Sequence, residues 1–528
     1  MRVGLRAALR LPPVVPRPSR SPALRGAALA AGAALALVGP LAGCAGRPRR
    51  APADLPVGAA GSAARAAAVA GGGSLDEAAP VWRRLGRLVP EGDLPFVGSV
   101  AFLAGRTPDT TQLLVALSLP SRALSFVREG DRYRAGYQVR LEARATGGAT
   151  GGATEAPPRT ATTEETVRVA TLKETTRAGE SVVVALPLAL APGRWTLAVA
   201  VRDAGSARVG TATLAALDVP RLGPGTLATP VPAYAATPRT HLDTLPRLVP
   251  SPRAEAGFAQ DSLLRVYVEA YAPYTPPARD TTPFTVMATV RDARDAVLWR
   301  DTVRLARRDV APPRAGAGRA PEPRVVEPRV VESRALHAGV IAVPVAPLGI
   351  GVATLEVSAG ARATARATLL VSLGDDLPAG SLDEALGYLR HFATPERLAA
   401  LRAAPAERRG AAWAAFLRDS DPVPATPEHE ALRDYFARLR AANARFGEDR
   451  TAGWLTDRGR AHIALGEPDQ ILDPNPADQG LKGRRQVWQY DAARVQLQFV
   501  DASGTGRWRL TAASAAEVDA ALRRQMVR

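Results

Sequence analysis

The strongest constraint on the fold is a change in hydrophobic period part-way along the chain. Between residues 95 and 375, short β-branched runs alternate apolar and polar side chains and are separated by Gly, Pro and Asp turns. This spacing is typical of all-β sandwiches. After Gly380 the apolar residues recur at helical spacing instead. The sequence therefore predicts a multidomain protein, all-β first and mixed α+β afterwards.

Two immunoglobulin-like β-sandwiches are predicted within the alternating part. They cover residues 95–220 and 239–375 and are joined by a linker at 221–238. Val201–Ala204 and Val290–Ala293 both have the sequence Val-Arg-Asp-Ala and fall at the same strand-to-turn place. This repetition suggests that the two sandwiches are related.

A Pro- and Arg-rich run interrupts the second predicted sandwich at residues 307–334. Arg-Val-Val-Glu occurs twice within it, at Arg324 and Arg329. Because a run this long and biased does not suit a compact domain, it is predicted to be a disordered insertion.

The first 43 residues have the layout of a bacterial signal peptide. Arginines without any acidic residue precede the apolar stretch Ala27–Val38, which is too short to span a bilayer comfortably. Leu41-Ala42-Gly43-Cys44 then resembles the lipobox, in which a peptidase cleaves between Gly43 and a lipidated Cys44. Cys44 is the only cysteine of the 528 residues, so a disulfide framework, thiol catalysis and a Cys-based zinc site are excluded.

Lipidation of Cys44 is expected to anchor the protein to a membrane. The resemblance implies a diacylglycerol on the thiol and a further acyl chain, such as palmitate, on the new amine; two or more chains anchor stably. Ala45 stands where inner-membrane lipoproteins typically have Asp, which favours the outer membrane, facing the periplasm or the cell surface. Residues 44–73 are Ala, Gly and Pro rich and predict a flexible tether, followed by a short helix at 74–94 capped by Ser74.

The C-terminal part, residues 380–528, is predicted to be an α+β module of three helices and then an antiparallel β-meander. The helices are expected to begin after Ser381, Thr394 and Thr426, and the third to stop at Gly447. The strands of this sheet are expected at residues 460–465, 486–491, 495–501 and 506–510.

The densest motif of the chain lies in this module. Gly453-Trp454-Leu455-Thr456-Asp457 is followed by Arg458-Gly459-Arg460 and by Gly466-Glu467-Pro468-Asp469. Together with Val487–Tyr490 and Phe499–Leu510, these residues resemble the GWxTD domain of bacterial secreted and lipid-anchored proteins. The resemblance covers about residues 381–510, and since the family has no established activity, it implies a setting but no mechanism.

The residue types of the motif indicate a structural corner with a possible binding role. Glycines permit close backbone approach, Trp454 supplies an apolar anchor, and Thr456 and Asp457 can accept hydrogen bonds from backbone N–H groups. Arg458 or Arg460 is expected to pair with Asp457 or Asp469, and loss of the Trp454 side chain to cost about 3–5 kcal/mol. The predicted motif positions are Gly453, Trp454, Thr456, Asp457, Arg458, Gly459, Arg460, Gly466, Pro468 and Asp469.

A catalytic alternative rests on Asp457, His462 and Asp469, because an Asp beside a His can act as a general base. The sequence has no nucleophile elbow, no His-Glu-x-x-His and no phosphate-binding glycine loop. Its five histidines are scattered singly, so no metal or other cofactor is predicted. An envelope hydrolase or transferase is therefore the second hypothesis, and a non-enzymatic protein is the first.

The strongly basic charge does not indicate nucleic-acid binding. The pI is about 10.9, but acidic residues interleave with the basic ones along the whole chain. Only Lys173 and Lys482 are lysines, and this excess of Arg, with abundant Ala, Gly and Pro, suggests codon bias. Removing residues 1–43 removes six Arg, so the formal charge becomes +17 − 6 = +11. The expected partners are the membrane, through Cys44, and an envelope protein.

Overall fold

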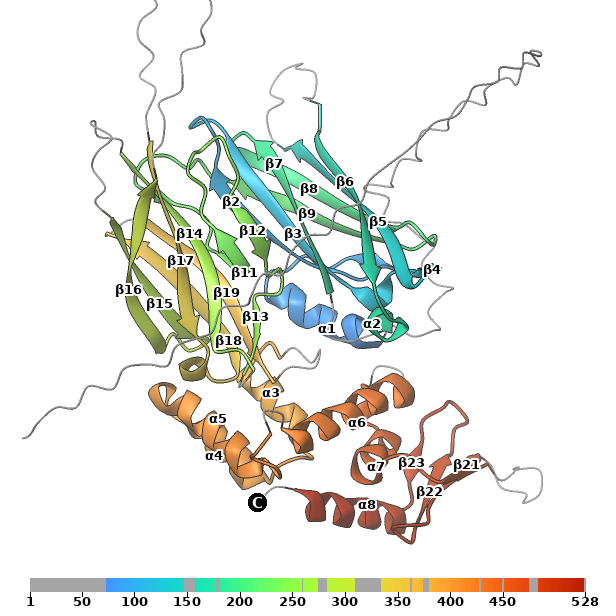
Figure 1. Ribbon diagram of the computed structural model, residues 1–528. Coiled ribbons are helices and arrows are strands. Elements are labelled where there is room, and N and C mark those ends of the chain that lie inside the picture. The colour runs from blue at the N-terminus through green and yellow to red at the C-terminus, as the bar shows by residue number, and fades with distance from the viewer. Residues whose placement is uncertain are drawn as a thin grey trace, which may run out of the picture. The chain divides into compact units, whose positions relative to one another are not determined.

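The computed structural model describes residues 73–146, 157–176, 181–258, 260–273, 283–308, 334–360, 363–373, 379–426, 429–448, 451–473 and 483–526 (Figure 1). All of these fall within one compact unit, Leu55–Arg528. Gly43, Cys44, the predicted tether up to residue 72 and most of the predicted insertion 307–334 lie outside the described residues. The predicted fold class is confirmed, since strands fill most of the described chain as far as Ser372 and helices with a small sheet follow.

The described part of the first sandwich contains the strands β1 (Glu91–Gly92), β2 (Val97–Ala104), β3 (Thr111–Pro120), β4 (Val127–Glu129), β5 (Arg132–Ala145), β6 (Arg159–Val169), β7 (Ser181–Leu190), β8 (Gly193–Asp203) and β9 (Val209–Val219). One sheet has the order β2-β3-β7, and the other has the order β1-β9-β8-β5-β4 with β6 beside β5. Alternate side chains face inward, so Leu113 and Leu117 of β3 share a core with Val139 and Leu141 of β5 and with Trp195.

Three short helical segments accompany this sandwich: α1 (Gly73–Arg84), η1 (Ser121–Ala123) and α2 (Leu172–Thr176). Helix α1 begins one residue before Ser74 and ends ten residues before the predicted limit at residue 94. The predicted helix was therefore too long, because Glu91–Gly92 pairs with β9 as β1. Trp82 of α1 is buried with Val97 and Leu370, a residue of the second sandwich.

The second sandwich is one continuous sheet of the strands β10 (Thr226–Leu227), β11 (Val231–Thr237), β12 (Arg247–Pro250), β13 (Glu255–Gly257), β14 (Leu263–Pro273), β15 (Phe284–Asp292), β16 (Val297–Arg308), β17 (Arg334–Pro344), β18 (Gly351–Ala359) and β19 (Ala363–Ser372). The order is β12-β11-β14-β17-β16-β15-β18-β19-β13, with β10 beside β14. Because β16 pairs with both β15 and β17, it joins two halves whose inner residues, such as Val268, Val286 and Leu355, share one core.

The predicted linker at 221–238 is not a linker. Its residues form β10 and β11, and both strands pair with β14 of the second sandwich. The prediction was wrong because Pro and Gly punctuate this stretch, whereas the pairing that orders it comes from a strand about 30 residues away.

A buried charged cluster connects the two sandwiches. Glu269 of β14 is fully buried and accepts two hydrogen bonds from Arg239, at 2.8 and 2.7 Å, and one from each of Tyr267 and Tyr271. Arg239 also donates to the carbonyl oxygen of Ala104 at the end of β2, and the Ala104 amide donates to Tyr271. The buried Glu269 carboxylate and its hydrogen-bond partners thus hold the first sandwich to the second. The buried polar groups of this cluster are hydrogen-bonded to one another.

The C-terminal module contains α3 (Leu382–Tyr388), α4 (Pro395–Ala403), α5 (Ala406–Ser420), α6 (Glu430–Phe446), η3 (Gly453–Leu455), α7 (Asp457–Leu465) and α8 (Ala512–Gln525), with a sheet in the order β20 (Gln470–Leu472), β21 (Arg484–Tyr490), β22 (Val495–Asp501) and β23 (Arg509–Leu510). The antiparallel meander is as expected, and Ser381 caps α3 by accepting a hydrogen bond from the Glu384 amide.

Three details of the module differ from the sequence prediction. Pro405 separates α4 from α5, so four helices and not three precede the motif. The last of them begins at Glu430, where the ring of His429 caps it by accepting from the Leu432 amide. Residues 460–465, predicted as a strand, belong to helix α7.

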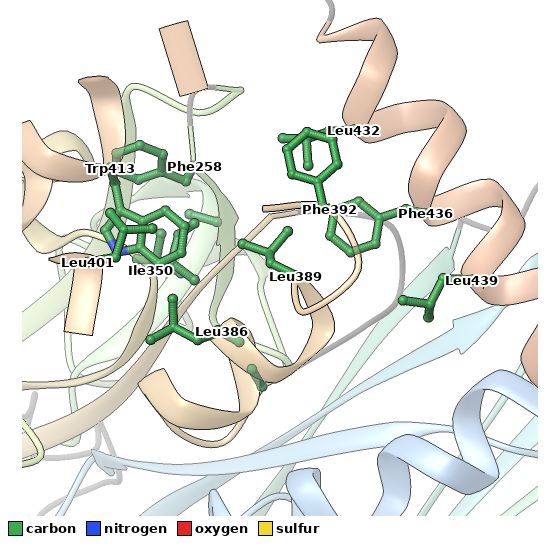
Figure 2. Packing of buried hydrophobic residues seen from close by; sticks show 14 of the residues in the cluster. Phe258, Ile350, Leu386, Leu389, Phe392, Leu401, Trp413, Leu432, Phe436 and Leu439 are labelled. Carbon is green, nitrogen blue, oxygen red and sulfur yellow. The ribbon is translucent and has the colours of Figure 1, made fainter. Parts of the chain in front are cut away.

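The module shares one hydrophobic core with the second sandwich. Figure 2 shows Phe258 and Ile350 of the sandwich together with Trp413 and Phe392 of the helices, all members of one buried cluster. Helix α5 lies so close to η2 (Ala346–Leu348) that a Cβ atom at Gly410 would be 1.9 Å from the Ala346 oxygen. This junction is therefore largely apolar and tightly packed. The junction between the sandwiches has an apolar cluster too, which includes Leu103 and Leu336, beside its charged cluster.

Candidate functional site

The motif forms a corner in which the one-turn helix η3 leads into α7. Thr456 occupies the N-cap position of α7, and its hydroxyl accepts a hydrogen bond from the Gly459 amide at 3.1 Å. The same hydroxyl donates to the Gly453 carbonyl oxygen at 2.8 Å. One side chain therefore ends η3 and starts α7, which is the usual reason for a Thr at this position.

The two glycines of the corner are required by space, as the sequence predicts. A Cβ atom at Gly459 would lie 1.9 Å from the Gly453 oxygen. A Cβ atom at Gly453 would lie 2.2 Å from the Ala442 oxygen of α6. The backbones of α6, η3 and α7 thus meet where no other residue fits.

Trp454 fills the inside of the corner and is only 8% exposed. The guanidinium of Arg390 lies over its indole, 4.7 Å from the ring centroid, and the Tyr388 ring is 5.6 Å away. The predicted role of Trp454 as an apolar anchor is confirmed, and a cation–π contact accompanies it.

Asp457, the first residue of α7, connects this helix to the meander. One carboxylate oxygen accepts a hydrogen bond from the Leu510 amide of β23 at 2.9 Å, and the other accepts from Arg460 at 3.4 Å. Arg460 also pairs with Asp519 of α8. The carboxylate near the N-terminus of α7 is further favoured by the helix dipole.

The expected pair of an arginine with Asp457 is made by Arg460 and not by Arg458. The Arg458 guanidinium lies between the rings of Phe446 and Trp508, 5.6 and 5.3 Å from their centroids. The nearest carboxylate is that of buried Glu448, at 3.8 Å, which also accepts a hydrogen bond from the Trp508 amide. Arg458 therefore joins the end of α6 to the meander.

His462 lies in the last turn of α7 and is buried, with 5% exposure, against the ring of Phe446. Burial lowers its pKa, since the environment disfavours the charged ring. The carboxylate near it is that of Glu467, whose oxygen is 3.8 Å from His462 Nδ1 and which Arg445 holds. Gly466, with φ +81°, ends the helix between them.

The structure does not bring Asp457, His462 and Asp469 together. Five positions separate Asp457 from His462 on one helix, which turns the two side chains to different sides. Asp469 instead accepts a hydrogen bond from the Asp491 amide at 2.7 Å, and the neighbouring Pro468 is buried. The three side chains thus have separate partners.

A comparison with protein-family models matches residues 375–505 to the GWxTD domain. The C-terminal module is a GWxTD domain. The match covers about a quarter of the 528 residues. No curated protein matches the chain.

Two small cavities lie outside the corner of the GWxTD domain. One is lined by α1 and the start of β2, including Trp82 and Phe96. The other lies under Phe436 and Tyr388, beside Ser372 of β19. Neither is lined by Asp457, His462 or Asp469, and the described residues contain no group of three metal-ligating side chains.

Two buried carboxylates of the GWxTD domain were not among the predicted motif positions. Glu448 directly follows the helix stop at Gly447, and Asp501 ends β22. Burial alone would raise the pKa of Asp501, but hydrogen bonds from Arg484, the Gly506 amide and Ser503 outweigh it and lower the pKa to about 2. The sequence feature that could have indicated Glu448 is its position directly after Gly447, the predicted helix stop.

Proposed function

We propose that the protein is a bacterial envelope lipoprotein anchored through Cys44, in the outer membrane. The support is the arginine-rich start, the short apolar stretch and Leu41-Ala42-Gly43-Cys44, which holds the only cysteine of the chain. Ala45, where inner-membrane lipoproteins have Asp, favours the outer membrane. None of the described helices is long and apolar enough to cross a bilayer.

The folded part is proposed to bind or scaffold an envelope protein and to have no catalytic role. The observation that carries this proposal is the 2.9 Å hydrogen bond from the Leu510 amide to Asp457. A carboxylate that accepts a backbone amide and an arginine holds the fold together and is not placed as a free base. Thr456 and Arg460 are likewise engaged within the domain.

Anchoring is tested with Cys44→Ser and Ala45→Asp proteins expressed as full chains. Cys44→Ser should incorporate no labelled palmitate and leave the membrane fraction after a wash at about 1 M salt, which screens electrostatic binding. Ala45→Asp should keep its label and move towards the inner membrane. A Cys44→Ser protein that withstands the wash would contradict the proposed anchor.

Binding at the corner is tested with a photo-crosslinking residue at Leu455, which is 39% exposed within the motif. A discrete adduct with an envelope protein is expected, and the same probe at exposed Thr302 of β16 serves as the control. If both positions gave the same products, a partner at the motif would be ruled out. An Asp457→Asn protein that stays folded and loses a defined hydrolase or transferase activity would favour the catalytic alternative instead.

A further inference from the structure

One end of the first sandwich carries two strongly exposed apolar side chains. Leu172, the first residue of α2, is 60% exposed, and Val127, the first residue of β4, is 52% exposed. Leu172 has the highest exposure of the large apolar side chains in the described residues. Exposure of this kind is tolerated where the side chains have a function at a surface.

The fold places Leu172 and Val127 on the same end of the sandwich. In the sheet register Val127 is opposite Arg134 of β5, and Arg134 is opposite Arg168 of β6. Strand β6 ends at Val169 and leads within three residues into α2. Helix α2 in turn contacts η1, the segment just before β4.

Basic side chains lie near these two apolar residues. Arg132 and Arg134 of β5 and Arg168 of β6 share the sheet face of Val127, because alternate residues of a strand point to the same face. We call the set the β4–α2 patch, and its members are Val127, Arg132, Arg134, Arg168, Leu172 and Lys173. The side chains of Arg134 and Arg168 are 44% and 52% exposed, and Arg132 and Lys173 are exposed as well.

Two acidic side chains near the patch are already engaged. Glu129 pairs with both Arg134 and Arg168, at 3.1 and 3.2 Å. Glu174 accepts hydrogen bonds from the Ala170 amide and the Thr171 hydroxyl, both at 3.0 Å. With exposed Arg128 and Asp131 of the same hairpin counted as well, five basic residues against three acids give this region a net charge of 5 − 3 = +2.

Another exposed apolar pair has the opposite surroundings. Ile471 and Leu472 of β20 are 43% and 44% exposed, but Asp469 and Asp473 flank them in sequence. Exposed apolar side chains of the described residues therefore do not all have a basic border.

We propose that the β4–α2 patch docks the protein on an anionic phospholipid surface. Basic residues are attracted to acidic headgroups, and apolar side chains inserted among the headgroups add to the binding. The inference rests on the proposed anchor at Cys44. The 72 − 44 = 28 residues between Cys44 and Gly73 span at most about 100 Å, which keeps the folded part near the bilayer.

The test uses a Leu172→Cys variant of the full chain, labelled with a polarity-sensitive fluorophore. Lipidated Cys44 has no free thiol, so the new cysteine is the only labelling site. The protein is mixed with vesicles of phosphatidylcholine alone or with phosphatidylglycerol added. A blue shift on the anionic vesicles only, reversed by about 1 M salt because the charges are then screened, is expected.

Flotation of the vesicles separates the two proposals. Protein that floats with both vesicle types but shows the same emission on each is anchored and does not dock, so the patch proposal is overturned. Protein that floats only with the anionic vesicles, and shows the blue shift there, supports docking and contradicts the anchor. Protein that floats with neither contradicts both.

Charge-reversal variants identify the patch itself. Arg132→Glu with Lys173→Glu should abolish most of the shift, whereas Arg300→Glu with Arg304→Glu, two exposed positions of β16, should leave it unchanged. Equal effects of both variants would overturn the assignment to this patch. The proposal would also be overturned if the fluorophore at position 172 were buried in whole membranes but exposed on pure lipid vesicles. That result would indicate that the patch binds an acidic protein surface.

Discussion

The two sandwiches share the sequence Val-Arg-Asp-Ala at the start of a hairpin turn but use its aspartate differently. Asp203 ends β8 and Asp292 ends β15, and each stands at the turn into the next strand of an antiparallel hairpin. Asp203 is bonded within its own sandwich, by the Ser125 amide and the Ser206 hydroxyl. Asp292 holds its turn through the amides of Arg294 and Ala296 and also pairs with Arg409 of α5 at 2.9 Å.

This difference shows which sandwich carries the GWxTD domain. The first sandwich completes its turn locally, whereas the second directs the equivalent carboxylate to a helix of the domain. Around that ion pair lie Trp413 and the close contact of Gly410 with η2. We expect the second sandwich and the GWxTD domain to unfold as one cooperative unit, with the first sandwich joined to them through the Arg239–Glu269 cluster.

The largest expected effect is at the charged junction. Glu269→Ala leaves Arg239 buried without its carboxylate and removes the acceptor of two tyrosine hydroxyls, so it should cost about 5 kcal/mol. Denaturant unfolding of the full chain measures the loss. Glu356→Ala, which breaks the exposed Arg366 pair, is the matched control and should cost less than about 1 kcal/mol. Similar costs for the two variants would mean that the cluster does not hold the sandwiches together.

Trp413→Ala tests the apolar junction. Its indole is fully buried, so the substitution should cost about 3–4 kcal/mol. Near-ultraviolet circular dichroism and hydrogen exchange should show β15 and α6 losing protection together. Loss of protection in the helices alone would show that the domain folds independently of the sandwich.

Trp454→Ala, at a side chain with 8% exposure, should cost about 3 kcal/mol and act within the domain.

Much of the β-region was predictable because burial alternates along its strands. The stretch Leu263–Ala270, in the range predicted as the second sandwich, lies within β14, whose side chains form part of the core. The neighbouring sequence did not indicate that Glu269 in that strand is part of a buried charged cluster, since its partner Arg239 lies 30 positions away in sequence. A buried charge is compatible with a strand only when such a partner exists, and sequence spacing does not reveal it.

The GWxTD corner was predicted in its residue roles but not in its secondary structure. Ala461–Leu465 is a short apolar run, and such a run does not distinguish helix from strand by period. The decisive signal was Thr456 followed by Asp457, an N-cap with an acid in the first turn. Both residues were expected to hold a structural corner, whereas they start helix α7.

A matched pair of arginine variants measures the difference between the two turns. Arg409→Ala should cost about 2 kcal/mol, because it removes a charged hydrogen bond from Asp292 in a site where both side chains are largely buried. In the first sandwich, Arg208 lies 3.7 Å from Asp203, and the Arg208 side chain is 36% exposed. Arg208→Ala should therefore cost less than about 1 kcal/mol. Equal costs would contradict a special role of the second turn in carrying the domain.

Acid should produce the smallest effect and should separate the two turns by location. Burial alone would raise the pKa of Asp292, but hydrogen bonds from the Ala296 amide, Arg409 and the Arg294 amide outweigh it and lower the pKa below its ordinary value. On acidification, Asp292 is therefore protonated at a higher pH in the unfolded chain than in the folded protein. The stabilisation is complete above the unfolded pKa of about 3.9 and is lost as the pH falls below it.

Hydrogen exchange locates the loss, since the pKa of Asp203 is lowered too, by bonds from Ser125 and Ser206 that outweigh burial. As the pH falls below about 4, α5 should lose protection in the wild type. In Asp292→Asn the protection of α5 should already be reduced at neutral pH and change less on acidification. Asp203→Asn should alter only the first sandwich, at the turn between β8 and β9 and around Ser125. If Asp203→Asn exposed α5 as well, the first sandwich would be coupled to the GWxTD domain as closely as the second.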